Sequence, residues 1–304
     1  MIFIQKLNIL FINKIRFLWR DCLNKILPPC TYQGAKQRVA SEIVDIIFER
    51  NPIYNDTKFY DLCCGTGSIS LELISRGINP NNIIMLDKST WGLFWNKIGR
   101  GEYDLEKFNK HINSIPKDVG KIQSYLKELS NQDPEIDEEY VYILLQAGSF
   151  GGKHIWKDNG KWNNTSFRNY WHPTATSKRR SHVNPMMPMP ETIKERMNAI
   201  VEKCKGLTCL QIDIYEFLEY IRFRNTENCI FYIDPPYKNT TNYGFTFDWE
   251  DFISLLFDET LAPIYVSEYE KFSEDAFLLD FKGVKGGISG NRKGKGTEWL
   301  NEYK

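Results

Sequence analysis

The sequence has no excess of charge of either sign, no long uninterrupted hydrophobic run, no internal repeat and no recurring cysteine spacing. Lysine plus arginine and aspartate plus glutamate number 39 each, so the net charge of +0 neither favours nor excludes a nucleic-acid partner. Solenoids, collagen and disulfide scaffolds are therefore excluded, and the seven cysteines are expected to be reduced thiols in a cytosolic protein. The 304 residues suffice for one large α/β domain, or for a core domain with an insert.

The first 27 residues are apolar and basic, and lysine and arginine side chains interrupt their hydrophobic stretch. A membrane span needs about 20 mostly apolar residues, so none is expected, and the missing small-residue cleavage site argues against a signal peptide. We expect residues 1–30 to be a docking helix or an upstream extension, with an amphipathic helix on a membrane surface as an alternative. The folded domain is predicted to begin near Thr31.

Short apolar runs alternate with helical patterns along most of the chain. The apolar spacing predicts one helix before the first strand and another directly after it, at 69–77. This alternation predicts an α/β, Rossmann-like fold with a mostly parallel, doubly wound sheet. The predicted strands are 58–64, 82–87, 207–213, 229–234, 262–269 and 276–281.

A long stretch, 88–205, interrupts this alternation, and its first half is helical and polar in pattern. We therefore interpret 31–99 and 206–304 as two halves of one sheet domain, and 100–205 as an inserted region. In open α/β sheets ligands bind beyond the carboxyl ends of the strands. The residues that follow the predicted strands are accordingly the first candidates for a functional site.

Acidic residues and a glycine turn follow three of these strands. Asp61 precedes the turn with Gly65 and Gly67, whereas Asp87 and Asp213 end later strands. The glycines let a ligand approach the backbone, and Asp87 follows by about 20 residues, the spacing of an acid that accepts hydrogen bonds from ribose hydroxyls. The turn alone would suit NAD, a flavin or S-adenosylmethionine, or a purely structural connection. The Asp61 carboxylate favours a cationic ligand such as S-adenosylmethionine and would repel a pyrophosphate.

The most specific motif is Asp234-Pro235-Pro236-Tyr237, directly after an apolar strand. Prolines lack an N–H donor, so this loop offers a carboxylate and carbonyl oxygens that can accept both hydrogens of an exocyclic amine. The ring of Tyr237 can stack on the planar base that carries the amine. Such positioning would point the amine lone pair at an electrophilic methyl group without prior deprotonation.

In order and spacing, these motifs resemble the Dam-like DNA adenine N6-methyltransferases over residues 31–304. The segment Tyr32-Gln33-Gly34-Ala35-Lys36 is similar to that family's aromatic-x-Gly-Gly-Lys motif, with alanine at the second glycine. The closing segment 286–292 and the EWLNEY that follows it are similar to the family's Ser-x-x-Asn segment and terminal helix. The resemblance implies that Asp234 to Tyr237 are catalytic. The cofactor contacts that it implies are Tyr32, Lys36, Asp61, Gly65, Gly67, Asp87, Asp213 and Asp234.

Basic, aromatic and amide side chains are interleaved between residues 153 and 182. Basic groups suit phosphates, and Asn or Arg can pair with base edges, although a solvated loop is the alternative. A second, glycine-rich basic run precedes the C-terminus and could clamp a nucleic-acid backbone. The candidate nucleic-acid contacts are Lys153, Lys157, Lys161, Asn163, Arg168, Lys178, Arg179, Arg180, Asn291 and Arg292.

We expect a site-specific methyltransferase that moves a methyl group from S-adenosylmethionine to the N6 amine of a flipped-out adenine in duplex DNA, with the insert as target-recognition region. Three alternatives are the same chemistry on RNA adenine, cytosine N4 or a protein glutamine amide, an inactive DNA-binding protein with a vestigial cofactor pocket, and a nicotinamide oxidoreductase. His154, His172 and His182 lack the spacing of a metal site, so no metal is expected. The protein is expected to be cytoplasmic and a monomer or weak dimer.

Overall fold

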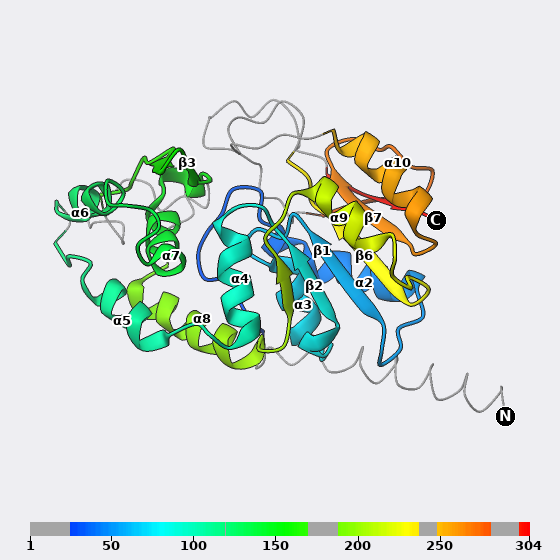
Figure 1. Cartoon of the computed structure of the whole chain (residues 1–304), viewed down its shortest axis with the longest axis horizontal. Helices are drawn as coiled ribbons and strands as arrows, with labels where there is room; N and C mark the ends of the chain where they lie inside the picture. The colour runs from blue at the N-terminus through cyan, green and yellow to red at the C-terminus, as the bar shows by residue number, and fades with distance from the viewer. Residues whose placement is uncertain (1–24, 119, 170–187, 237–247, 281–297) are drawn as a thin grey trace.

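The computed structural model describes residues 25–118, 120–169, 188–236, 248–280 and 298–304. Within these ranges the centre of the molecule is a seven-stranded sheet in the order β5-β2-β1-β6-β7-β9-β8 (Figure 1). Numbered along the chain within this sheet, the order is 3-2-1-4-5-7-6, and its first five strands follow the doubly wound pattern. The strands are β1 (Lys58–Leu62), β2 (Ile83–Leu86), β5 (Thr208–Leu210), β6 (Cys229–Ile233), β7 (Ile264–Glu268), β8 (Ala276–Leu278) and β9 (Trp299–Tyr303).

The pairing within the sheet is mostly parallel. Strand β1 pairs in parallel with β2 and β6, which in turn pair in parallel with β5 and β7. Strand β9 runs antiparallel to both β7 and β8. The mostly parallel α/β sheet expected from the sequence is confirmed, and it is compatible with a Rossmann-like fold.

The expectation of a terminal helix over EWLNEY is wrong, because Trp299–Tyr303 form β9. This strand lies between β7 and β8, so its backbone groups pair on both sides. Leu300 is fully buried in the core at the same time. A helix here would leave the β7 edge unpaired inside the protein, and buried backbone groups without partners are costly.

Helices cover both faces of the sheet. Helices α2 (Ala40–Arg50) and α3 (Ser68–Ser75) pack on one face, and α9 (Ile214–Ile221) and α10 (Trp249–Glu259) pack on the other (Figure 1). Along β6, Ile230 and Tyr232 belong to the hydrophobic core on the side of α2 and α3. Phe231 and Ile233 belong to the core on the side of α9 and α10. This period of two places an apolar layer on each face, as a strand buried on both sides requires.

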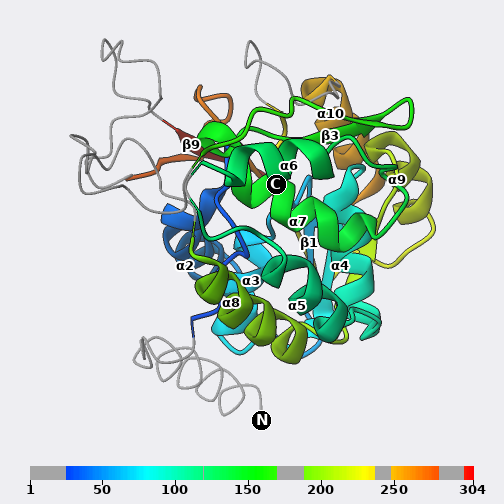
Figure 2. The same cartoon turned by 90° about the vertical axis from the view of Figure 1, so that its left-hand side faces the viewer.

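The connection from β2 to β5 contains the region expected as an insert. Helix α4 (Thr90–Arg100) packs beside β5, and further helices lie beyond it, at one edge of the sheet (Figure 2). Helix α7 is almost entirely buried, and its side chains belong to the same hydrophobic core as those of α2, α3 and α4. Its elements are α5 (Leu105–Asn113), α6 (Ile122–Leu129), α7 (Glu138–Gly148), the hairpin of β3 (Trp156–Asp158) and β4 (Lys161–Asn163), and α8 (Pro190–Lys203).

The packed part of the chain begins before Thr31. Ile26 and Cys30 are 3% and 1% exposed, and the Ile26 N–H donates to Ser75 Oγ at 3.0 Å. Residues 1–24 lie outside the described ranges. In the part of the chain that the structure describes, six cysteines are free thiols, and no helix has the length and apolar character needed to cross a membrane.

Candidate active site

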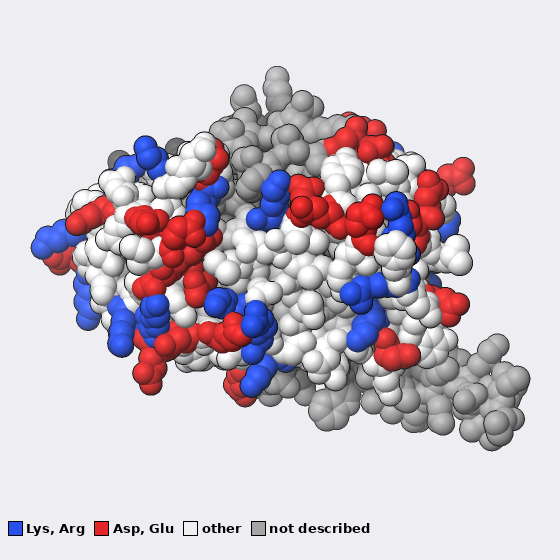
Figure 3. Space-filling model, viewed as in Figure 1, with Lys and Arg blue, Asp and Glu red and all other residues white. Residues whose placement is uncertain are grey.

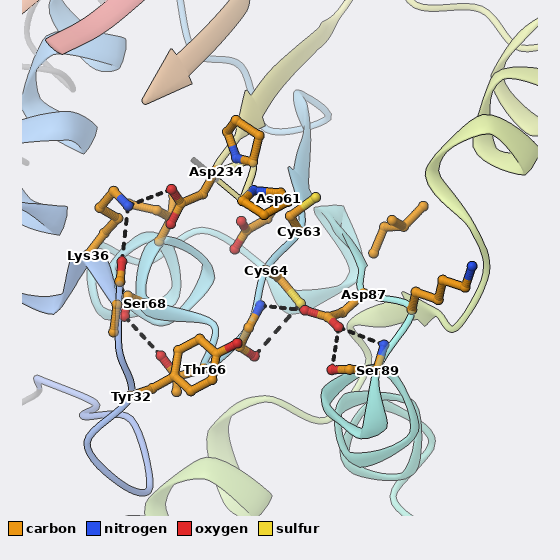
Figure 4. A pocket seen from close by; sticks show the side chains of 18 of the residues that line it. Tyr32, Lys36, Asp61, Cys63, Cys64, Thr66, Ser68, Asp87, Ser89 and Asp234 are labelled. Atoms are coloured by element: carbon orange, nitrogen blue, oxygen red, sulfur yellow. Dashed lines mark hydrogen bonds and ion pairs between the residues drawn. The ribbon is translucent and has the colours of Figure 1, made fainter. Parts of the chain in front are cut away.

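A cavity of about 350 Å³ opens at the carboxyl ends of β1, β2 and β6. This is where the strand order reverses from one side of β1 to the other, and open α/β sheets bind ligands at such a point. Figure 4 shows side chains from widely separated segments converging on it. The predicted site residues that line the cavity are Tyr32, Lys36, Asp61, Gly65, Asp87, Asp213, Asp234, Pro235 and Pro236.

The turn after β1 uses a left-handed backbone at several positions. Cys63, Gly65 and Gly67 have φ angles of 60°, 48° and 70°. Gly65 lines the cavity, and its carbonyl oxygen accepts a hydrogen bond from Trp95 Nε1 at 2.8 Å. The turn therefore leaves backbone exposed to the cavity at Gly65.

Gly67, expected among the cofactor contacts, does not line the cavity. It precedes α3, where a Cβ atom would lie 2.6 Å from Trp95 Cζ2. Glycine is required here because helix α4 packs closely against the turn, whereas the sequence spacing suggested approach of a ligand.

The carboxylate of Asp87 is held at the end of β2 by three hydrogen bonds (Figure 4). Its Oδ2 accepts from the Gly65 N–H at 2.8 Å. Its Oδ1 accepts from the Ser89 N–H at 2.9 Å and from Ser89 Oγ at 2.6 Å. An ionised carboxylate has about four acceptor positions, so Asp87 keeps capacity for a hydroxyl donor that enters the cavity.

The side chain of Asp61 belongs to β1 itself and is only 2% exposed. Its Oδ2 accepts hydrogen bonds from Ser70 Oγ at 2.6 Å and from the Ser70 N–H at 3.2 Å. Burial raises the pKa of Asp61 to about 7, and the nearby carboxylates of Asp234 and Asp87 add to this, while the Ser70 hydrogen bonds oppose it. Asp61 is therefore poised to change its protonation state when a cation enters the cavity.

The ammonium group of Lys36 contacts oxygen atoms of other residues in the protein. Its Nζ lies 2.5 Å from Asp234 Oδ1 and 3.0 Å from the Gly34 carbonyl oxygen, and the Glu298 Oε1 atom is 3.3 Å away. The side chain is 3% exposed. Lys36 lines the cavity, and its ammonium group points at Asp234 (Figure 4).

The end of β6 presents Asp234, Pro235 and Pro236 to the cavity. The Asp234 N–H donates to the Leu62 carbonyl oxygen at 3.2 Å, which continues the pairing of β6 with β1 by one residue. Pro235 and Pro236 have no N–H donors, so their backbone contributes only carbonyl oxygens to hydrogen bonding. Tyr237, the fourth residue of the motif, lies outside the described residues.

Asp213 lies at the rim of the cavity and caps α9. Its Oδ1 accepts from the Tyr215 N–H at 3.0 Å, and its own N–H donates to Glu216 Oε2 at 2.9 Å, which completes a capping box. Lys88 Nζ lies 2.8 Å from Oδ2, and this hydrogen bond lowers the pKa of Asp213. Both oxygens of Asp213 therefore already have a structural partner.

Sequence reasoning missed two residues near the cavity. His154 lines it and is 4% exposed, with its ring centroid 5.5 Å from that of Tyr32. Glu298, buried next to Lys36, is the second. Each lies far along the chain from its partner. The sequence offered His154 only as a histidine without metal-site spacing and Glu298 only as the first residue of EWLNEY, so the fold alone places them near the cavity. No group of three or more metal ligands occurs among the described residues.

Two of the ten candidate nucleic-acid contacts are engaged within the protein, contrary to expectation. Lys157 Nζ lies 2.6 Å from Glu138 Oε2 and 2.9 Å from Glu135 Oε1, because β3 lies beside the acidic start of α7. Arg168 is 7% exposed. In Figure 3 acidic and basic side chains are interspersed over the visible face.

The remaining candidate contacts divide into two groups. Lys153 and Lys161 are exposed, and Asn163 is half-buried. The other five lie outside the described residues: Lys178, Arg179, Arg180, Asn291 and Arg292.

The chain matches no protein-family model and no curated protein in sequence comparisons. The fold and site define it as an α/β protein with a mostly parallel sheet and an acid-rich cavity at the strand ends. Any more specific function must be argued from the residues of that cavity.

Proposed function

We propose that this protein is an S-adenosylmethionine-dependent methyltransferase that acts on the N6 amine of adenine in duplex DNA. The observation that carries the proposal is that Asp87 and the Asp234-Pro235-Pro236 loop line the same cavity. Asp87 could accept hydrogen bonds from the ribose of a cofactor, and the Asp234-Pro235-Pro236 loop could accept the hydrogens of a substrate amine, within one cavity. This combination was recognised from two motifs that lie far apart in the sequence.

The charges of the cavity suit a cationic cofactor. Asp61 and Asp87 line it, whereas its two lysines are each paired with an aspartate, Lys36 with Asp234 and Lys88 with Asp213. A pyrophosphate would face these carboxylates without a free cation among the described lining residues, which weighs against a nicotinamide oxidoreductase. The reversed strand β9 also departs from the dinucleotide-binding order 3-2-1-4-5-6.

The residues present fit S-adenosylmethionine. Asp87 would accept hydrogen bonds from the ribose, the backbone at Gly65 allows close approach, and ionised Asp61 would face the positively charged end. The cavity volume of about 350 Å³ lies in the range of small-molecule sites. When bound, this cofactor supplies an electrophilic methyl group.

The chain itself would supply positioning and electrostatics. The Asp234 carboxylate and the Pro235 carbonyl oxygen would accept the two hydrogens of the amine, which orients its lone pair. Lys36 holds Asp234 through its Oδ1 atom. Once the amine nitrogen carries four bonds, it is positively charged, and the adjacent carboxylate stabilises that charge until the proton leaves. The base must first leave the duplex, which costs a few kcal/mol.

Among the described residues, the candidate contacts to the substrate polymer are Lys153, Lys161 and Asn163. An adenine in RNA, a cytosine N4 amine and a glutamine amide present the same pair of hydrogens to Asp234. A non-catalytic DNA-binding role would not explain the buried ion pair between Lys36 and Asp234 that faces the cavity.

The test is sequencing of plasmid DNA, with detection of modified bases, from a methylation-deficient host that expresses the chain. We expect N6-methyladenine in one short sequence context with the natural sequence and none with Asp234→Ala, while purified Asp234→Ala still binds S-adenosylmethionine. The matched control is Asp118→Ala, at an exposed aspartate outside the cavity. Unmarked DNA with cofactor binding retained would redirect the proposal to RNA or protein amides, and equal marking by Asp234→Ala would refute the mechanism.

A further inference from the structure

Glu298 is a buried carboxylate that faces the same ammonium group as Asp234. It directly precedes β9, is 7% exposed, and places Oε1 3.3 Å from Lys36 Nζ. The Glu298 carbonyl oxygen accepts a hydrogen bond from the Leu279 N–H at 2.9 Å, which anchors its backbone. One lysine is thus shared by two carboxylates, one directly after β6 and one directly before β9.

A third carboxylate, Glu268, increases the negative charge around this lysine. It ends β7, whose Val266 pairs with Ile233 of β6, so the ends of the two strands are adjacent. Glu268 is 4% exposed, and its Oε1 accepts from the Tyr269 N–H at 2.8 Å. Its Oε2 has no hydrogen-bond partner among the described residues. Burial raises the pKa of Glu268, and the charge of Asp234 adds to this.

Among the described residues, the cluster therefore consists of one cation, Lys36, and three acids, Asp234, Glu268 and Glu298. Because a lysine bound by a single carboxylate neutralises it almost fully, a second carboxylate on the same ammonium leaves more negative charge on the first. Among the described residues, the titratable and charged groups that surround Asp234 are Lys36, Asp61, Cys63, Tyr232, Glu268, Tyr269 and Glu298.

We propose that Glu298 is a positioning residue that shares the Lys36 ammonium with Asp234 and thereby keeps Asp234 both fixed and strongly hydrogen-bond accepting toward the substrate amine. This role rests on the proposed function, and it concerns a residue that acts through Lys36 without touching the base. The negative charge of Glu298 disfavours ionisation of its neighbour. Its removal should lower the pKa of Asp234 and weaken it as an acceptor.

The experiment compares the natural sequence with Glu298→Gln, which keeps the shape of the side chain but removes its charge. The pKa of Asp234 is read from the side-chain carboxyl resonance of ¹³C-labelled aspartate, assigned with Asp234→Asn. We expect a decrease on the order of one pH unit in Glu298→Gln. Methyl transfer should fall on the order of 10-fold in kcat, with the acidic limb of its pH profile moved to lower pH. Glu298→Asp retains the charge, so the acidic limb of its pH profile should lie at the same pH as that of the natural sequence.

The matched control is Glu302→Gln, in β9, the strand that Glu298 directly precedes. Glu302 is equally buried but pairs with Arg50 and Lys304, away from Asp234. Its replacement should leave the Asp234 titration unchanged. An unaltered Asp234 pKa in Glu298→Gln would overturn the inference, as would an equal shift in both variants.

The outcome separates this inference from the proposed function. If the natural sequence transfers no methyl group, the proposed function fails, and the Asp234 titration still decides whether Glu298 acts on it. If Glu298→Gln does not fold, Glu298→Ala takes its place, and its Asp234 pKa is compared with that of the natural sequence. A decrease is again expected, because the same negative charge is removed. An unchanged Asp234 pKa would overturn the inference.

Discussion

Lys36 Nζ lies 2.5 Å from Asp234 Oδ1, although 198 residues separate the two in the sequence. Lys36 comes from the short helix η2 (Lys36–Arg38) before the sheet, and Asp234 follows β6, the fourth strand of the sheet along the chain. The pair joins the motif at the start of the folded region to the loop proposed to hold the substrate. Both residues line the cavity and the lysine is buried, so we expect the pair to matter for stability and for the proposed chemistry.

Replacing Lys36 by methionine should therefore have a large effect on stability and activity. The variant keeps the buried stem but leaves Asp234 and Glu298 without their cation. Breaking a buried ion pair on one side costs about 3–5 kcal/mol, measured as the free energy of unfolding in urea. Lys88→Met is the comparison, because the pair of Lys88 with Asp213 is half exposed and such pairs contribute about 0–1 kcal/mol. Similar losses in the two variants would contradict the importance assigned to the buried pair.

Cofactor binding should depend on pH through Asp61. Its pKa is about 7 in the free protein, and a bound cation favours the ionised form, so binding releases a proton. Affinity for S-adenosylmethionine should rise with pH and level off above 7. At one pH unit below the pKa it should be roughly 10-fold weaker than on the plateau. Isothermal titration calorimetry at pH 6, 7 and 8 measures this.

The variants Asp61→Asn and Asp213→Asn distinguish the source of that pH dependence. Asp61→Asn should bind weakly with a flat profile between pH 6 and 8. Asp213→Asn should keep the slope, because the pKa of Asp213 is lowered by Lys88 and its charge is constant in this range. A slope that survives in Asp61→Asn would assign the proton to another group.

Gly67→Ala should destabilise the protein more than Gly77→Ala. Both glycines have a positive φ, at 70° and 86°, so an alanine is strained at either position by about 1–2 kcal/mol. At Gly67 the new methyl group would also lie 2.6 Å from Trp95, whereas at Gly77 no atom lies within 4 Å. Overpacking adds about 1–3 kcal/mol. Urea unfolding of both variants gives the difference, and equal losses would show that the turn can move away from α4.

The two lysines of the hairpin should behave differently in DNA binding. Lys161 is exposed, so Lys161→Ala should weaken binding and reduce the salt slope by about 1. Lys157→Ala should leave the slope unchanged, because its ammonium is paired with Glu138 and Glu135. Fluorescence anisotropy with a labelled duplex at several salt concentrations measures both slopes. A reduced slope in Lys157→Ala would mean that it leaves its carboxylate partners to bind phosphate.

Local patterns in the sequence were sufficient for most elements of the fold. The strands around Asp61, Asp87 and Asp234 lie where the apolar runs predict them. Alternation of strands and helices also implied a mostly parallel sheet, and such a sheet gathers the ends of its strands at one edge. The cavity could therefore be anticipated from the residues that follow the strands.

The terminal strand and the ion-pair partners of Lys157 could not be predicted from local sequence patterns. The segment Trp299–Tyr303 is a strand because β7 and β8 offer their backbone edges to it, which is a property of the assembled sheet. Lys157 has basic neighbours in sequence but acidic neighbours in space, since α7 begins beside the hairpin. Charge patterns along a chain do not show which side chains meet after folding.

The sequence by itself determined the α/β pattern, the glycine turn and the Asp-Pro-Pro loop, because each depends on residues that are close along the chain. Only the tertiary structure decided which of these residues contact one another and which role each contact has. It made Gly67 a packing position against Trp95, and it brought Glu298 to the ammonium that holds Asp234. The physical reason is that burial, charge sharing and strand pairing arise between distant segments and exist only once the sheet has brought them together.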